Sequence, residues 1–108
     1  MMGGNPETDL QREIVAALEQ LGCLVYRLNA GGYRSRVQLC PPGTPDLLVI
    51  AVDGAVIWME VKLPHANSKV SQSQIEHHEL LRSRAQIVAV VRSVPQALGV
   101  IDGVTGSQ

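Results

Sequence analysis

Residues 45–62 read PDLLVIAVDGAVIWMEVK, and this stretch decides the fold. It holds two apolar runs of strand length, Asp46 to Val52 and Ala55 to Lys62, separated by Asp53-Gly54. An Asp-Gly pair between two such runs is a strong signal for a β-hairpin. The first run is almost continuously apolar, which is typical of a strand covered on both faces. We therefore predict an antiparallel hairpin that forms the middle of the domain's sheet.

Three charged side chains stand at the open end of this hairpin. Side chains alternate faces along a strand, so Glu60 and Lys62 project from the same side. A tight turn at Asp53-Gly54 places residue 46 opposite about residue 61, which brings Asp46 next to both. Two carboxylates can hold Mg²⁺ or Mn²⁺, and a metal with a nearby lysine suits phosphodiester hydrolysis. The alternative is an ordinary cross-strand ion pair in which Lys62 offsets the two acids.

The residues before the hairpin predict a helix, a strand and a loop. Thr8 opens the helix, because Thr8 and Gln11 fit a capping box. Gly22 is a typical C-terminal stop. A strand over residues 23–29 follows, and residues 30–43 form a long loop of the kind that is often functional.

The residues after the hairpin predict a helix and a further strand. Ser71 and Gln74 fit a second capping box, at the start of a helix that runs to about Arg84. An apolar strand over residues 86–92 follows, and its helical crossover should make it parallel to the second hairpin strand. Pro95 begins a short final helix. The whole order predicts an α/β fold, α-β-β-β-α-β, with a mixed sheet flanked by helices.

The 108 residues form one domain, which we place at residues 7–101 between flexible tails at 1–6 and 102–108. The net charge of −1 argues against a nucleic-acid partner, but residues 27–44 contain three arginines and no acid. The chain has only three aromatic residues, too few for a surface built on base stacking.

The cysteines and the apolar stretches of the sequence indicate the cellular compartment of the protein. Cys23 and Cys40 form no CxxC pair and have no histidine at zinc spacing, so we expect neutral thiols. No stretch approaches the roughly 18 apolar residues of a membrane span, and the first residues do not have the pattern of a signal peptide. We expect a soluble cytoplasmic protein with no membrane partner and no organic cofactor.

The ordered motifs resemble the VRR-NUC branch of the PD-(D/E)XK nuclease superfamily. Asp46 of Gly43-Thr44-Pro45-Asp46 stands fourteen residues before Glu60 of Glu60-Val61-Lys62. Each motif alone is weak, but the ordered set is specific and covers about residues 7–97. The other matching pieces are Leu10-Gln11, Arg27 to Gly31, Leu63-Pro64, Ser71 to Gln74 and Val90 to Ser93. The resemblance implies a restriction-endonuclease-like core, whose element order is the one predicted above.

The resemblance also implies roles for residues of the hairpin and the first helix. Asp46 and Glu60 would be metal ligands, with the backbone carbonyl of Val61 as a third. Lys62 would be the catalytic lysine. Gln11 matches the first-helix glutamine of the family's catalytic site, and its alternative role is the cap described above.

The remaining candidates are weaker. Glu7 lies one turn before Gln11 and is either an outer ligand of the metal or a solvated acid at the helix start. Gln74 matches the second-helix glutamine of the family, and it can also act as a cap. The candidate contacts to nucleic acid are Asn29, Arg34, Arg36, Lys69 and Gln74. The three histidines lack a metal-ligand spacing, and we expect His78, three residues from both Ile75 and Leu81, to be half-buried.

By this resemblance the chain is a Mg²⁺- or Mn²⁺-dependent endonuclease from a bacterium or a phage. Stand-alone members of the family look like Holliday junction resolvases, which act as homodimers on branched DNA. A two-fold dimer suits a four-way junction, in which two symmetric strands are cut. The alternatives are a flap or nicking nuclease of the same chemistry, and a non-catalytic DNA-binding scaffold.

Overall fold

A computed structural model of the protein describes residues 5–28, 40–65 and 68–105. Its elements follow the predicted order, with the final helix longer than expected. They are α1 (Pro6–Gln20), β1 (Leu24–Arg27), β2 (Leu47–Ile50), β3 (Val56–Val61), α2 (Gln72–Ser83), β4 (Ile87–Val91) and α3 (Val94–Thr105). None of the helices in the described ranges is long and apolar enough to cross a membrane.

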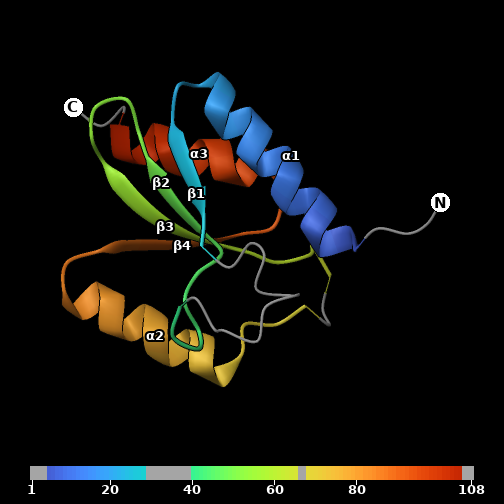
Figure 1. Ribbon diagram of the computed structural model, residues 1–108, viewed down its shortest axis with the longest axis vertical. Helices are drawn as coiled ribbons and strands as arrows, with labels where there is room; N and C mark the ends of the chain where they lie inside the picture. Colours follow the sequence, from blue (N-terminus) through green and yellow to red (C-terminus); the bar gives the residue numbers. More distant parts are fainter. Residues whose placement is uncertain (1–4, 29–39, 66–67, 106–108) are drawn as a thin grey trace.

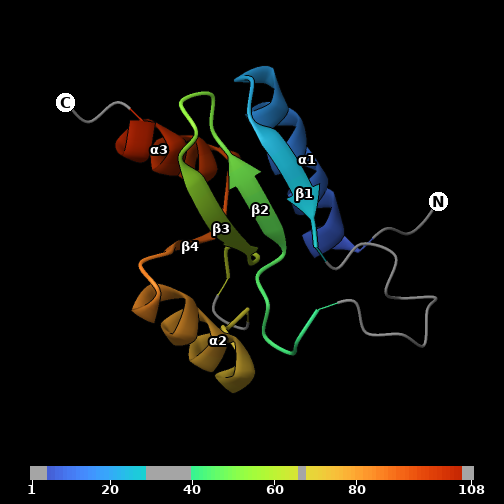
Figure 2. The same cartoon turned by 60° about the vertical axis from the view of Figure 1, so that its left-hand side comes forward.

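The four strands form one mixed sheet in the order β1-β2-β3-β4. β2 is antiparallel to both β1 and β3, whereas β4 runs parallel to β3, as predicted from the α2 crossover. α1 and α3 cover one face of the sheet, and α2 lies on the other, next to β4 (Figures 1 and 2). The predicted α/β fold with helices on both sides of a mixed sheet is confirmed.

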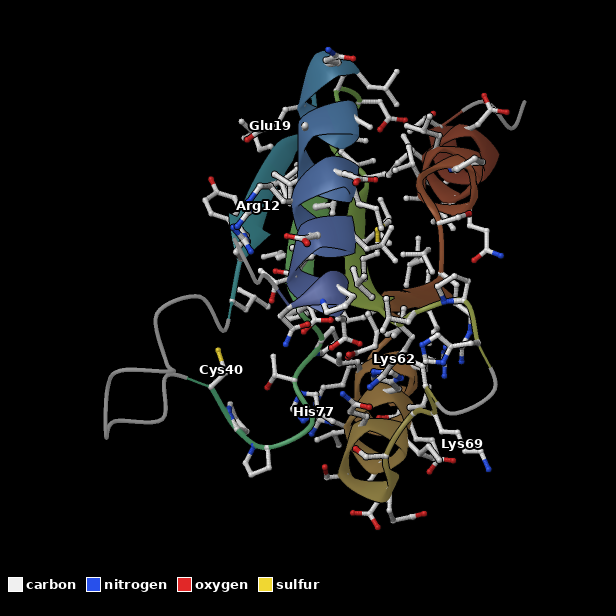
Figure 3. The ribbon with its side chains drawn as sticks, turned by 90° about the vertical axis from the view of Figure 1, so that its right-hand side faces the viewer. Arg12, Glu19, Cys40, Lys62, Lys69 and His77 are labelled. Carbon is white, nitrogen blue, oxygen red and sulfur yellow. The ribbon has the colours of Figure 1, made fainter. Side chains whose placement is uncertain are left out.

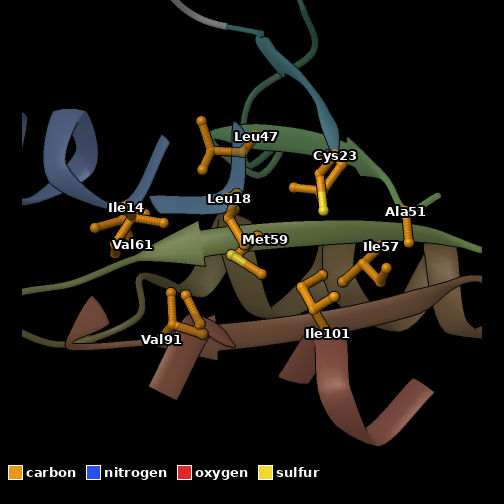
Figure 4. Close-up of a cluster of buried hydrophobic side chains, with 12 residues drawn as sticks. Ile14, Leu18, Cys23, Leu47, Ala51, Ile57, Met59, Val61, Val91 and Ile101 are labelled. Carbon is orange, nitrogen blue, oxygen red and sulfur yellow. The ribbon is translucent and has the colours of Figure 1, made fainter. Parts of the chain in front are cut away.

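The core lies between the sheet and the pair α1 and α3 (Figure 4). Alternate residues of the hairpin point into it, and Ile14 and Leu18 of α1 and Ile101 of α3 complete it. The strand residues in this core are Leu47, Val49, Ile57, Met59, Val61 and Val91. Cys23 is a buried free thiol of the same core, and burial raises its pKa. This packing leaves the opposite face of β3 for Trp58 and Glu60.

The hairpin turn has three residues rather than the predicted two. Ala51 N donates to Ala55 O at 2.8 Å, and Gly54, with φ +94°, lies inside the loop that they close. Leu47 therefore pairs with Met59, and continuing this register places Asp46 opposite Glu60 instead of opposite Val61. The prediction was wrong by one residue, because the Asp-Gly signal locates the turn without fixing its length.

The first helix begins two residues earlier than predicted. Asn5 is its N-cap: the side-chain oxygen of Asn5 accepts hydrogen bonds from Glu7 N at 2.9 Å and Thr8 N at 3.3 Å. Pro6 follows at the first helical position, where its fixed φ favours the helix and its missing N–H costs nothing. The predicted capping box of Thr8 and Gln11 is therefore wrong.

The second helix begins as predicted, whereas the third runs past its expected end. Both bonds of the capping box between Ser71 and Gln74 are present, and α2 ends at Ser83. α3 continues to Thr105, so the tail expected from residue 102 is helical over its first four residues. Burial of Ala97 and Ile101, one turn apart, stabilises this helix against the core despite its two glycines. Residues 30–39 of the predicted long loop lie outside the described part of the chain.

Candidate active site

Two carboxylates meet at one end of the hairpin. Asp46 directly precedes β2, and its Oδ2 accepts a hydrogen bond from Val61 N at 2.9 Å. Glu60, one residue earlier on β3, is only 1% exposed. Residues opposite each other in an antiparallel pair share a face of the sheet, so the register puts Asp46 on the side of Glu60. The predicted proximity of Asp46 and Glu60 is confirmed.

The segment before Asp46 packs closely against the start of α2. Gly43 has φ +86°, and a Cβ at this position would overlap the backbone carbonyl of Ser73. Thr44 is buried, and its hydroxyl donates to Pro41 O at 2.7 Å. The close approach of Gly43 to Ser73 places the chain before Asp46 against the start of α2 and leaves no room for a side chain at position 43.

Helix α2 supplies two side chains to Glu60. Gln74 Nε2 donates to Glu60 Oε2 at 3.0 Å, while Gln74 Oε1 accepts from Ser71 N at 2.8 Å. Gln74 thus caps α2, as predicted, and also contacts Glu60, whereas its contact with nucleic acid stays a prediction. His78 is 3% exposed, and its Nε2 lies 3.5 Å from Glu60 Oε1. His78 is fully buried rather than half-buried as expected, and its approach to Glu60 was not predicted, although its place one helical turn after Gln74 was a usable signal.

The electrostatics of the pair disfavour two ionised carboxylates side by side. Burial and, after it, the neighbouring Asp46 together raise the pKa of Glu60 to about 9, against an opposing effect of the Lys62 charge. Burial also lowers the pKa of His78, which favours a neutral imidazole next to Glu60. Without an added positive charge, the ionised form of Glu60 is therefore strongly disfavoured.

The charge of Lys62, a residue labelled in Figure 3, acts on this site by lowering the pKa of Glu60. In the described residues, no carboxylate oxygen lies within 4.0 Å of its ammonium nitrogen. Its backbone N–H donates to Val91 O at 3.0 Å, which fixes its place at the end of β3. The described residues therefore show no direct ion pair between Lys62 and the two acids, although the charge of Lys62 lowers the pKa of Glu60.

A solved structure described as a VRR_NUC domain is similar to this chain over nearly its whole length. The two are 35% identical, the match covers 92% of this chain and 97% of the other, and the TM-score is 0.69. The chain belongs to the VRR-NUC family. It therefore has a nuclease fold with a restriction-endonuclease-like core. No family model and no curated protein matches the chain.

The first helix brings two more polar residues of this VRR-NUC domain to the same end of the sheet. Gln11 Oε1 accepts a hydrogen bond from Arg27 Nε of β1 at 3.1 Å, so its side chain is not the predicted cap. Glu7 is near enough for its charge to raise the pKa of Glu60. The start of α1 thus borders the site, and a role for Glu7 as an outer ligand stays a prediction.

The predicted nucleic-acid contacts of the VRR-NUC domain are only partly described. Asn29, Arg34 and Arg36 lie outside the described residues. Lys69 is exposed, and it directly follows the segment from Leu63 to Ser68, which comes after β3. Arg92 holds this segment through Nη1, which donates to Leu63 O and Ser68 O at 2.7 Å each, an anchor that sequence reasoning did not identify.

The residues present suit a hard divalent cation. The described part of the VRR-NUC domain has no three His, Cys, Asp or Glu side chains arranged to hold a metal by themselves. Mg²⁺ commonly takes one or two carboxylates and completes its shell with water and substrate phosphate. Asp46 and Glu60 are such a pair, and the buried Glu60 Oε1 has no hydrogen-bond donor. The Val61 carbonyl remains a predicted third ligand.

Proposed function

We propose that this VRR-NUC domain is a metal-dependent DNA endonuclease that uses Mg²⁺ or Mn²⁺ and prefers branched DNA. The observation that carries the proposal is the buried Glu60 beside Asp46, together with a lysine that has no carboxylate partner in the described chain. Two adjacent acids that repel each other are costly unless a cation joins them. The lysine then remains available for a negatively charged substrate.

The proposed reaction is hydrolysis of a phosphodiester. A water oxygen forms a bond to phosphorus, the bond from phosphorus to the bridging oxygen breaks, the attacking water loses a proton and the leaving oxygen gains one. A bound cation would neutralise charge on the phosphate and make the water more acidic. Lys62 contributes a fixed positive charge near the phosphate, where negative charge increases in the transition state. Gln74 holds Glu60 in place during this step.

We further propose that the domain acts as a homodimer with the activity of a Holliday junction resolvase. A two-fold dimer presents two sites to the two symmetric strands of a four-way junction. The domain has nine lysines and arginines, and a dimer doubles this limited basic charge. A dimer at micromolar concentration in sedimentation supports this form of the proposal, and a clean monomer contradicts it.

Cleavage assays test the activity and its target together. Labelled four-way junction, flap and linear duplex are incubated with the protein in Mg²⁺, Mn²⁺ or EDTA. We expect metal-dependent cleavage that is fastest on the junction and that Asp46→Asn slows by roughly 100-fold or more, while Asp102→Asn, an exposed change on α3, leaves it unchanged. Preferred cleavage of the flap would redirect the substrate assignment. Binding of DNA without cleavage in any metal would identify a non-catalytic scaffold and overturn the proposal.

A further inference from the structure

A pair of buried polar atoms lies between α2 and β3. His78 Nε2 and Glu60 Oε1 are 3.5 Å apart, and the two residues are 3% and 1% exposed. Neither atom has a hydrogen-bond partner in the described structure. Buried polar atoms are nearly always hydrogen-bonded, because water no longer satisfies them. Two such atoms that face each other therefore indicate an interaction which is completed in another state of the site.

His78 lies next to Gln74 on α2, and both side chains contact Glu60. Residues four apart on a helix lie on the same face, so His78 and Gln74 approach Glu60 from one side. Gln74 Nε2 already donates to Glu60 Oε2 at 3.0 Å. α2 thus presents one nitrogen to each oxygen of the same carboxylate. The capping box at Ser71 fixes the first of them, and the burial of the imidazole fixes the second.

We infer that His78 is a positioning residue which, with Gln74, orients the Glu60 carboxylate towards Asp46 for a divalent cation. A neutral imidazole carries one N–H, and the tautomer with this hydrogen on Nε2 donates to Glu60 Oε1. A shift of a few tenths of an ångström brings the two atoms into the usual hydrogen-bond range of roughly 2.7–3.2 Å. This inference rests on the proposed function, because the cation belongs to that proposal.

The physical benefit is a carboxylate with one fixed orientation. An oxygen that accepts one hydrogen bond keeps a second lone pair, so both oxygens of Glu60 remain able to bind a cation. Partners that orient metal ligands commonly contribute about 10–100-fold in metal affinity. His78 would act through Glu60 and would touch neither the cation nor the DNA.

Metal binding without DNA tests the inference separately from catalysis. Mn²⁺ is titrated calorimetrically into the parent protein and into His78→Leu, His78→Gln and His77→Leu. Leucine fills the buried space but cannot donate, whereas the glutamine amide nitrogen reaches about as far as Nε2. We expect ~10-fold weaker Mn²⁺ binding for His78→Leu, and binding within about 3-fold of the parent for His78→Gln. His77→Leu, a change of the neighbouring residue, controls for altered helix packing.

The outcomes separate the two proposals. If the parent does not bind Mn²⁺, the proposed metal site and this inference both fail. If the parent binds and His78→Leu binds equally well, only the role of His78 is wrong. If His78→Leu does not fold, equal binding by His78→Gln and the shorter His78→Asn overturns the inference, and a loss confined to asparagine supports it. Cleavage by His78→Leu should need more Mn²⁺ for half-maximal rate, with an unchanged KM for DNA.

Discussion

Asp46 lies directly opposite Glu60 across the β2–β3 hairpin, although fourteen residues separate them in the chain. The three-residue turn sets this relationship, because a register shifted by one residue moves every side chain to the other face of the sheet. Asp46 would then share the face of Val61 and point into the core. The carboxylate pair therefore depends on the length of a turn at the far end of the hairpin.

The first prediction concerns Asp46 itself. Asp46→Asn keeps an oxygen that can accept from Val61 N, so we expect its midpoint of thermal unfolding to stay close to that of the parent. It removes one ligand charge, and cleavage should fall by roughly 100-fold or more, which corresponds to about 3 kcal/mol of lost transition-state stabilisation. Cleavage rates in saturating Mn²⁺, together with thermal melts, measure both effects. Cleavage at the parental rate would show that this carboxylate is not a ligand.

The second prediction concerns the pH dependence of the metal-free protein. The pKa of Glu60 is raised to about 9 in the folded state, so the folded protein binds more protons than the unfolded chain above the ordinary carboxyl pKa. The stabilising contribution is complete below about pH 4.5 and is lost as the pH rises towards 9. The maximal slope is about 1.4 kcal/mol per pH unit.

Urea unfolding in EDTA at several pH values between 5 and 9 measures this slope. Glu60→Gln removes the titrating group and should flatten the profile, with the variant more stable than the parent at pH 8. Added Mn²⁺ should stabilise the parent more at pH 8 than at pH 6, because the cation competes with a proton for Glu60. The same slope in Glu60→Gln as in the parent would assign the titration to another group.

The third prediction separates backbone strain from close packing. Gly43 and Gly54 both have positive φ, but only Gly43 lies against backbone, at Ser73. Gly54→Ala should cost about 1 kcal/mol of unfolding free energy, from the left-handed conformation alone. Gly43→Ala should cost clearly more and should also slow cleavage, because the chain before Asp46 must move. Equal losses in urea unfolding for the two variants would show that the contact with α2 is unimportant.

The fourth prediction concerns Lys62. Lys62→Met should slow cleavage by about 100-fold, since a positive charge near the phosphate is lost. Its free energy of unfolding should change by less than about 0.5 kcal/mol, because no ion pair to a described carboxylate is broken. Single-turnover cleavage and urea unfolding measure the two quantities. A large loss of unfolding free energy in Lys62→Met with unchanged cleavage would show that Lys62 has a structural role only.

The sequence predicts this fold well where local signals are strong. Asp53-Gly54 locates the hairpin, and the capping box locates the start of α2. Sequence reasoning failed where one local signal competes with another: the Asn5-Pro6 pair is a stronger helix start than Thr8. It also stopped α3 too early, because glycines in the sequence hide the burial of Ile101 against the core.

The residues of the site that lie in sequence motifs were predictable. Asp46, Glu60 and Lys62 follow from strand alternation and the hairpin. The contact between His78 and Glu60 did not, because it depends on how α2 lies against the sheet, which no local pattern encodes. The same holds for the bond between Gln11 of α1 and Arg27 of β1, two residues sixteen positions apart in the chain.

Gln74 joins the first turn of α2 to Glu60 through the two ends of a single amide group. Fraying of that turn would therefore release the carboxylate at the same moment, so opening of the helix end and loss of the site are one event. The exchange rate of the Ser71 amide hydrogen, which is held by the same glutamine, reports how often the site comes apart. A ligand that restricts the motion of the Glu60 side chain should slow exchange of the Ser71 amide hydrogen, although it does not contact Ser71.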